Sequence, residues 1–322
     1  MQGMQVKASC RLPVGARNAA RSGSNSTIFE SMRGIVQTLM QHSLDSGELC
    51  TPGFMVAAGM ITSSLGLKEI QHIPAPAGLD QLQVAAQWHS SPEISSMPIL
   101  LVPGVRCGPE RPSLASVDEL DLMRGEETLC AGLIANRVIA GPAVVMNLGS
   151  HWKAIQLDEK GRIAASVTSL SGELIHATQQ NTILAGSVAQ DWPTHFSEPW
   201  IQAGMSEQRR SGLARSAFCA RLLDLQRQAT PEDRLAFLVG AFIASDLDPL
   251  LAQKFFQRGS RIALVGSSAV ANAWHYALST AQLASIIISQ KQTEEALLTA
   301  LRLILKYCIS SSSSHSRRTY SS

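Results

Sequence analysis

Several motifs that would assign a function at once are absent from this chain. No two cysteines have the C-x-x-C spacing of zinc and redox sites, and neither an H-E-x-x-H metal motif nor a G-x-S-x-G nucleophile turn occurs. The G-x-x-x-x-G-K-[ST] and G-x-G-x-x-G phosphate loops are missing as well. These absences argue against a metalloenzyme, a Ser-His-Asp hydrolase and the two commonest kinds of nucleotide-binding loop.

The chain is also poor in charge. Charged residues make up 16% of the sequence and hydrophobic residues 45%, and 27 basic against 25 acidic residues give a net charge of +2. This composition predicts a folded chain, and the balance of signs indicates neither a nucleic-acid nor a membrane partner. A length of 322 residues favours two domains over one.

Long apolar runs are missing too. The longest candidate, residues 261–278, is interrupted by Asn272, His275 and several serines, so we expect a soluble protein with no membrane span. The six cysteines stand singly, most of them in apolar surroundings, as is typical of reduced thiols in the cytoplasm. The first 29 residues contain no acid and no sustained apolar core, which argues against a secretory signal and leaves a mitochondrial-type presequence open.

The hydrophobic pattern predicts an α/β chain. Ile28, Met32, Ile35, Leu39 and Met40 recur at helical spacing, which predicts a helix over residues 28–43. Short apolar runs predict strands at 54–60, 98–105, 143–148, 152–157, 162–168 and 261–267. Further helices are predicted at 172–184, 206–227, 231–245, 269–282 and 293–306, before a polar tail, 308–322, that is expected to be disordered.

Four of the predicted strands run into glycine-containing turns. These turns have the sequences AAGMITSSLG, LVPGVRC, NLGSHWK and LVGSSA. At the ends of strands in α/β folds, free backbone N–H groups and the small size of glycine let an anion approach. We expect either a phosphate-handling cleft or plain turn chemistry, and the sequence does not choose between them.

The segment MRGEET, residues 123–128, has two interpretations. Glu126 and Glu127 are typical of the first turn of a helix, where the helix dipole favours acids. Alternatively, Arg124 suits a carboxylate or phosphate, and the two glutamates suit hydroxyl groups or Mg²⁺. The two interpretations are compatible.

Two further segments carry groups that suit an oxyanion. Gly149, Ser150 and Lys153 in NLGSHWK offer backbone, hydroxyl and ammonium donors. Alternatively, the segment is the start of a β-hairpin with an exposed lysine. Ser171 and Gly172 in SLSGEL precede a predicted helix, where helix capping and anion binding are both expected.

Taken in order, these segments resemble a known family. AAGMITSSLGLKEIQHIPAPAGLDQL, ILLVPGVRC, DLMRGEET, NLGSHWKAIQLDEKGRI, SLSGELIHATQQNTIL and RIALVGSSAVANAW resemble successive segments of the 2-dehydro-3-deoxygalactonokinases, over roughly residues 14 to 280. The resemblance implies a two-domain α/β fold of the hexokinase/actin-like ATPase type with a central cleft. We expect an N-terminal domain over 1–118, a C-terminal domain over 119–307 and the tail over 308–322.

The resemblance also implies a reaction. Members of this family use ATP and Mg²⁺ to phosphorylate the terminal hydroxyl of 2-dehydro-3-deoxy-D-galactonate, a step of D-galactonate catabolism. Catalytic roles are then expected for Arg124, Glu126 and Glu127, and substrate contacts for Arg17, Gly59, Met60 and Ser63. Residues expected near the phosphates and the nucleotide are Gly149, Ser150, Lys153, Ser171, Gly172, Gly266 and Ser267.

The sequence departs from the family at its start. The family opens with a strand and a D-x-G-T-T-N-x-R-like phosphate loop, whereas no such segment precedes Val14 and the first acid is Glu30. A clipped gene model and an inactive relative both explain this difference. We therefore expect a cytoplasmic sugar-acid kinase, with a non-catalytic sugar-acid binder as the alternative; a homo-oligomer is left open.

Overall fold

The chain folds into two compact units in the computed structural model, which describes residues 6–15, 19, 22–45, 52–256 and 259–318. The first unit comprises Met1–Arg106, Leu122–Gly132 and Leu297–Ser322, and the second comprises Cys107–Asp121 and Leu133–Ala296. Helices and strands alternate in both, so the predicted α/β class is confirmed. The division at residues 118 and 119, expected from the sequence, stays a prediction.

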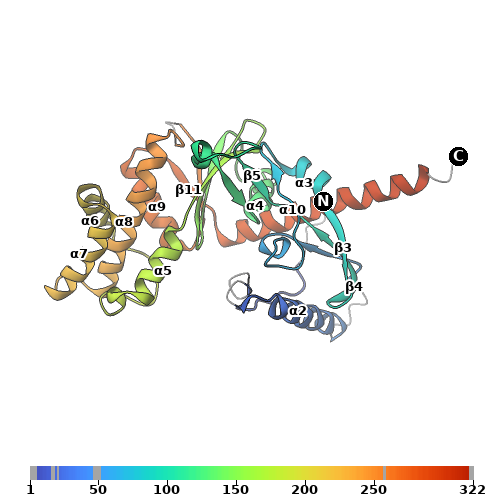
Figure 1. Ribbon diagram of the computed structural model, residues 1–322, viewed down its shortest axis with the longest axis horizontal. Coiled ribbons are helices and arrows are strands. Elements are labelled where there is room, and N and C mark those ends of the chain that lie inside the picture. The colour runs from blue at the N-terminus through green and yellow to red at the C-terminus, as the bar shows by residue number, and fades with distance from the viewer. Residues whose placement is uncertain (1–5, 16–18, 20–21, 46–51, 257–258, 319–322) are drawn as a thin grey trace. The chain divides into compact units, whose positions relative to one another are not determined.

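A three-stranded sheet in the order β1-β4-β3 lies in the first unit (Figure 1). Strand β1 (Met55–Ala57) pairs in parallel with β4 (Ser95–Leu101), and β3 (Gln87–Ser91) pairs antiparallel with β4. Helix α2 (Ser26–Asp45) packs its apolar stripe on one face, where Ile99 and Leu101 are fully buried. The helix that the apolar spacing predicts over residues 28–43 is therefore present as α2.

A second small sheet leads to the MRGEET segment. Its order is β2-β5-β6, from Ile73–Pro74, Val105–Cys107 and Asp121–Met123, with a 3₁₀ segment, η2 (Leu114–Glu119), between the last two strands. Helix α3 (Leu79–Ala85) follows β2, and helix α4 (Glu126–Ala135) starts three residues after β6. These strands of two or three residues have no sequence pattern of their own, and none of them is predicted.

The second unit is built on a five-stranded sheet. Its order is β11-β10-β7-β8-β9, from Ser285–Ile287, Ile262–Gly266, Ala143–Leu148, Trp152–Leu157 and Ile163–Ser169. Strands β7, β8 and β9 form an antiparallel meander, whereas β10 runs parallel to both of its neighbours. The carboxyl ends of β7 and β10 therefore meet at one edge of the sheet.

The helices of the second unit share one hydrophobic core with this sheet (Figure 1). They are α5 (Ser171–Asn181), α6 (Glu198–Ser211), α7 (Leu213–Leu225), α8 (Pro231–Ala252) and α9 (Ser268–Thr280), with a 3₁₀ turn, η3 (Ile183–Gly186), after α5. The core includes Trp152 and Trp274, whose rings meet edge to face with centroids 5.5 Å apart. Helix α10 (Gln290–Arg318) is longer than the helix predicted over residues 293–306 and continues past residue 306.

Helix α8 is the core helix of this unit. Thr230 caps it by accepting a hydrogen bond from Asp233 N, and Pro231 stands at its first position. Among the described residues it is the one helix long and apolar enough to cross a membrane, but 67% of that window is buried inside the protein.

One predicted helix is wrong. Residues 206–227 were expected to form a single helix, yet the chain forms α6 and α7 with Gly212 between them. Gly212 has a φ of 81°, a left-handed value that ends a helix and that glycine adopts without strain.

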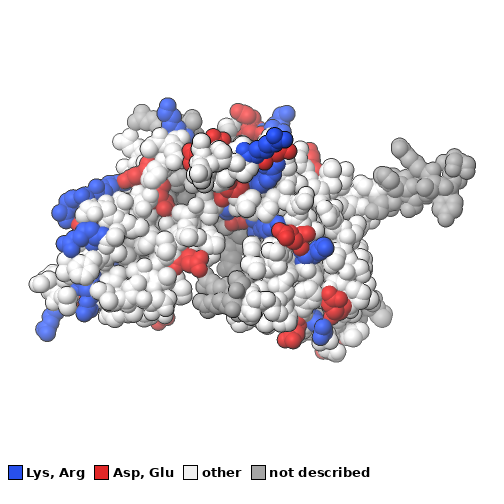
Figure 2. Space-filling model, in the orientation of Figure 1, with Lys and Arg blue, Asp and Glu red and all other residues white. Residues whose placement is uncertain are grey.

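The face in Figure 2 shows arginine side chains gathered over α6 and α7. Arg209, Arg210 and Arg221 each pair with an acid, namely Asp248, Glu207 and Asp224. Their charges are thus compensated locally.

Candidate functional site

In the first unit, the chain turns tightly after β1. Thr62 donates through both its N–H and its hydroxyl to the carbonyl of Gly59, each at 2.9 Å, and the Ser63 hydroxyl donates to the Met60 carbonyl at 2.7 Å. Of the substrate residues predicted here, Ser63 is buried with its hydroxyl engaged inside the turn, and Met60 is half exposed. Gly59 packs beside the backbone of residues 124 and 125.

Arg124 ties that turn to the segment that follows it. Its Nη1 donates to Thr62 Oγ1 at 3.0 Å and its Nη2 donates to the Ile70 carbonyl at 2.7 Å, with His72 Nδ1 at 3.4 Å. Burial lowers the pKa of Arg124, and the charge of Glu127 opposes that shift. A guanidinium has five N–H donors, so these contacts orient it and leave donors for a ligand carboxylate.

Glu127 holds the start of helix α4. Both of its oxygens accept the N–H of Gly125, at 2.9 and 2.7 Å, and Oε1 also accepts the Thr128 hydroxyl at 2.9 Å. Gly125 has a φ of 109°, a value that favours glycine. The helix-start interpretation therefore accounts for Glu127, whereas the neighbouring Glu126 is only partly buried.

The Glu127 carboxyl is buried, and burial raises its pKa from 4.5 to about 7. Between these two pH values the unfolded chain loses the proton and the folded chain keeps it, so folding becomes less favourable as the pH rises.

We expect Glu127→Gln to remove this pH dependence. From pH 4.5 to about 7, the wild type should lose up to about 3 kcal/mol of unfolding free energy relative to the variant, measured by urea denaturation. Glu159→Gln, at an exposed position of the β8–β9 turn, is the control and should track the wild type. A constant difference between wild type and Glu127→Gln across this range would contradict the assignment.

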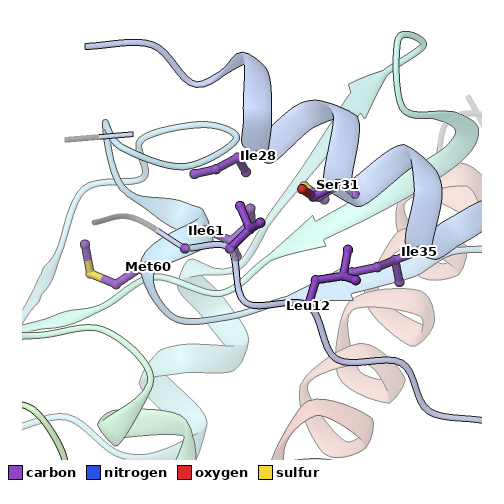
Figure 3. Close-up of a pocket in the computed structure, with 9 residues that line it drawn as sticks. Leu12, Ile28, Ser31, Ile35, Met60 and Ile61 are labelled. Atoms are coloured by element: carbon purple, nitrogen blue, oxygen red, sulfur yellow. The ribbon is translucent and has the colours of Figure 1, made fainter. Parts of the chain in front are cut away.

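A cavity of about 220 Å³ lies beside the turn after β1. Figure 3 shows it between Ile28, Ser31 and Ile35 of α2, Leu12, and Met60 and Ile61 of the turn. A larger cavity of about 380 Å³ lies between α2 and strands β1 and β4, and its lining is apolar as well. Neither lining suits a hydroxyl-rich acid, which favours the polar side of the turn, at Arg124, for such a ligand.

In the second unit, the β7–β8 turn meets the start of α5. Glu173 N donates to the Ser150 carbonyl at 2.6 Å, and a Cβ built on Gly172 would lie 2.3 Å from the Gly149 carbonyl oxygen. Only glycine allows this approach of the two backbones. His151 and Glu173 add a hydrogen-bonded pair at 3.1 Å. Gly149, Ser150, Ser171 and Gly172, which the sequence predicts from separate segments, thus lie together.

The end of β10 lies at the same edge of the sheet. Gly266 is the register partner of Leu148, the last residue of β7, and a Cβ on Gly266 would lie 2.8 Å from the Leu148 carbonyl oxygen. Ser267 stands at the N-cap position of helix α9. Three backbone turns therefore converge where two parallel strands end, which is the usual ligand position in α/β sheets.

Lys153 is placed differently. Its side chain is buried on β8, with Nζ 2.5 Å from Thr168 Oγ1 and 3.5 Å from Asp121 Oδ2. The Thr168 hydroxyl also lies 2.8 and 2.9 Å from the two Asp121 oxygens. Lys153 belongs to a buried polar cluster in this structure, and its predicted contact with phosphate stays a prediction.

No cluster of three or more His, Cys, Asp or Glu side chains that could hold a metal occurs in the part of the chain that the structure describes. Mg²⁺ is usually held by one or two carboxylates together with waters and substrate phosphates. Arg17 lies outside the described residues.

The chain is similar to proteins of a known family. Residues 6–301 match the model of a family described as 2-keto-3-deoxy-galactonokinase. The crystal structure of a candidate 2-dehydro-3-deoxygalactonokinase from Sinorhizobium meliloti is similar over 83% of each chain, at 24% identity and a TM-score of 0.66. None of the curated proteins matches at the required significance. The family match and this structure agree with the predicted α/β fold class.

Two more distant structures resemble parts of the fold. The activator of 2-hydroxyisocaproyl-CoA dehydratase from Clostridium difficile, with bound ADPNP, has 17% identity over 59% of this chain and 69% of its own, with a TM-score of 0.37. Component A of (R)-2-hydroxyglutaryl-CoA dehydratase from Acidaminococcus fermentans has 15% identity over 56% and 68%, with a TM-score of 0.38. These scores are too low to bear on function.

Proposed function

This chain belongs to the 2-keto-3-deoxy-galactonokinase family, and we propose that it transfers the γ-phosphoryl group of ATP to the terminal hydroxyl of 2-dehydro-3-deoxy-D-galactonate. The observation that carries the proposal is the convergence of the turns at Gly149–Ser150, Ser171–Gly172 and Gly266–Ser267 at one edge of the second unit's sheet. Backbone N–H groups at such turns and at helix starts bind phosphate oxygens.

On the sugar-acid side, Arg124 receives the substrate carboxylate. Its guanidinium is oriented by Thr62 and the Ile70 carbonyl, so little side-chain entropy is lost when the substrate binds. We assign Gly59, Met60 and Ser63 to the wall formed by the turn beside it. Arg17 remains a proposed contact from the family resemblance.

The glutamates have separate roles in this proposal. Glu127 holds the turn at Gly125 and thereby the backbone that carries Arg124. The two hydrogen bonds from Gly125 N to the Glu127 carboxylate support this role. Glu126 is the carboxylate of this pair that is available to a substrate hydroxyl or a metal, because it is partly exposed.

The chemistry requires positioning and charge neutralisation more than covalent catalysis. Mg²⁺, when bound with ATP, neutralises charge on the phosphate oxygens. The chain's own residues orient the donor through the turns of the second unit and the acceptor through Arg124. We place the enzyme in the cytoplasm, and assembly into a homo-oligomer stays a prediction.

The direct test is release of ADP from ATP and Mg²⁺ that depends on the sugar acid. Turnover should appear with 2-dehydro-3-deoxy-D-galactonate and be weaker with its 4-epimer. Saturable binding of the sugar acid without turnover would support the non-catalytic alternative, and absence of both would overturn the proposal.

Gly172→Ala tests the phosphate turns. The added methyl carbon cannot fit 2.3 Å from the Gly149 carbonyl, so the two turns must move apart. We expect the KM for ATP to rise by about tenfold or more, since a displacement near 1 Å at a binding group has large effects. Gly186→Ala, where nothing lies within 4 Å of the added carbon, is the control. Equal KM values for both variants would contradict the placement.

A further inference from the structure

Helix α8 carries two aspartates in different surroundings. Asp248 is partly exposed and forms an ion pair with Arg209, with N–O distances of 2.8 and 2.9 Å. Asp246 is partly buried, and burial raises its pKa. Among the residues that the structure describes, Asp246 has no cationic partner within ion-pair distance; its carboxylate instead meets hydroxyl groups. Removing a carboxylate from water without a counter-charge costs free energy. The hydrogen bonds that Asp246 makes to hydroxyl groups offset part of that cost.

That contact leads to the start of α5. The Ser169 hydroxyl donates to Asp246 Oδ2 at 2.5 Å. Ser169 Oγ also accepts the N–H of Ser171 at 3.3 Å and lies 3.0 Å from Ser171 Oγ. Ser169 ends β9 and Ser171 begins α5, so the carboxylate on α8 fixes the hydroxyls at the junction between them.

The same first turn of α5 is bound from its other side. Gly172 lies against the Gly149 and Ser150 carbonyls, and Glu173 N donates to Ser150 O. The junction is therefore held between the β7–β8 turn and helix α8. A shift of the Ser169 hydroxyl would move Ser171 and the N–H groups next to it.

We infer that Asp246 is a positioning residue for the donor nucleotide, which acts through Ser169 and Ser171 to hold the first turn of α5 in place for the phosphate groups. The inference rests on the proposed function, which assigns this turn to phosphate. Asp246 touches no reacting atom in this account. Its effect is confined to nucleotide binding and does not extend to the sugar acid.

The test compares Asp246→Ala, Asp246→Asn and the control Asp248→Ala in steady-state kinetics with ATP and 2-dehydro-3-deoxy-D-galactonate. Asp246→Ala should raise the KM for ATP about tenfold, equivalent to about 1.4 kcal/mol, with kcat and the sugar-acid KM within about twofold of wild type. Asp246→Asn should recover most of the affinity, because its amide oxygen can accept the same hydrogen bond from Ser169. Asp248→Ala should match the wild type.

Ser169→Ala cuts the same link from its other end and serves if Asp246→Ala fails to fold; it should raise the ATP KM in the same way. An unchanged ATP KM in both Asp246→Ala and Ser169→Ala, or a parallel rise in the KM of the sugar acid, would overturn the inference. A wild-type chain that shows no phosphotransfer overturns the proposed function instead, so the two failures are distinguishable.

Discussion

Replacing Arg124 by alanine is expected to lower kcat/KM for the sugar acid by about a hundredfold, because hydrogen bonds to a charged group contribute roughly 1.5–3 kcal/mol. Arg124 is held by Thr62, the Ile70 carbonyl and His72, so its guanidinium is oriented before any ligand arrives. The KM for ATP should stay near the wild-type value, since the proposed function assigns ATP to other residues than Arg124.

Two variants separate binding from folding at this position. Arg124→Lys keeps the charge but loses the planar fork, so activity should be intermediate. Methylguanidinium added to Arg124→Ala should restore part of the activity if the lost group binds substrate. Arg162→Ala removes an arginine that pairs with Asp158 on the β8–β9 hairpin and should leave kcat/KM unchanged. Full activity of Arg124→Ala would contradict the substrate assignment.

Replacing Lys153 by methionine is expected to destabilise the protein by about 3–5 kcal/mol, as measured when one partner of a buried ion pair is removed. The variant removes the buried Lys153 ammonium from beside Asp121, whose side chain is only 10% exposed, and Thr168. Urea unfolding measures the loss. The double variant Asp121→Asn with Lys153→Met removes both charges and should recover most of the stability.

The same variants decide between the two roles of Lys153. A lysine that binds phosphate would, when replaced, raise the KM for ATP with little loss of stability. If Lys153 instead stabilises the buried cluster, Lys153→Met should lower the free energy of unfolding while changing the KM for ATP less. The double variant should then recover most of the stability and a KM near that of the wild type. Lys160→Met, on the exposed β8–β9 turn, is the matched control. Unchanged unfolding free energy in Lys153→Met would contradict the structural role.

The parts of the fold that were predictable are those set by local sequence. Strands β7 and β8 match their predicted bounds, 143–148 and 152–157, because turn residues bound each of them. Helix α2 follows its 3.6-residue periodicity. The break at Gly212 was missed because a single glycine within a helical segment does not by itself predict a helix end. The left-handed φ of Gly212 ends α6.

The candidate site divides in the same way. Gly149, Gly172 and Gly266 were predictable, since glycine at a strand or helix end has a local reason. Asp246 and Asp121 were not, because their partners lie 77 and 32 residues away in sequence. The sequence around an aspartate is the same whether its side chain faces water or a serine hydroxyl, and only the tertiary fold distinguishes the two.

The measurement that tests the account most directly is the identity of the product. The folded wild-type chain, ATP, Mg²⁺ and 2-dehydro-3-deoxy-D-galactonate would be followed by ³¹P and ¹³C NMR. The account predicts a phosphomonoester on the terminal carbon of the sugar acid, formed together with ADP in equal amounts. An ester at another hydroxyl, or no ester while the protein remains folded, would contradict it.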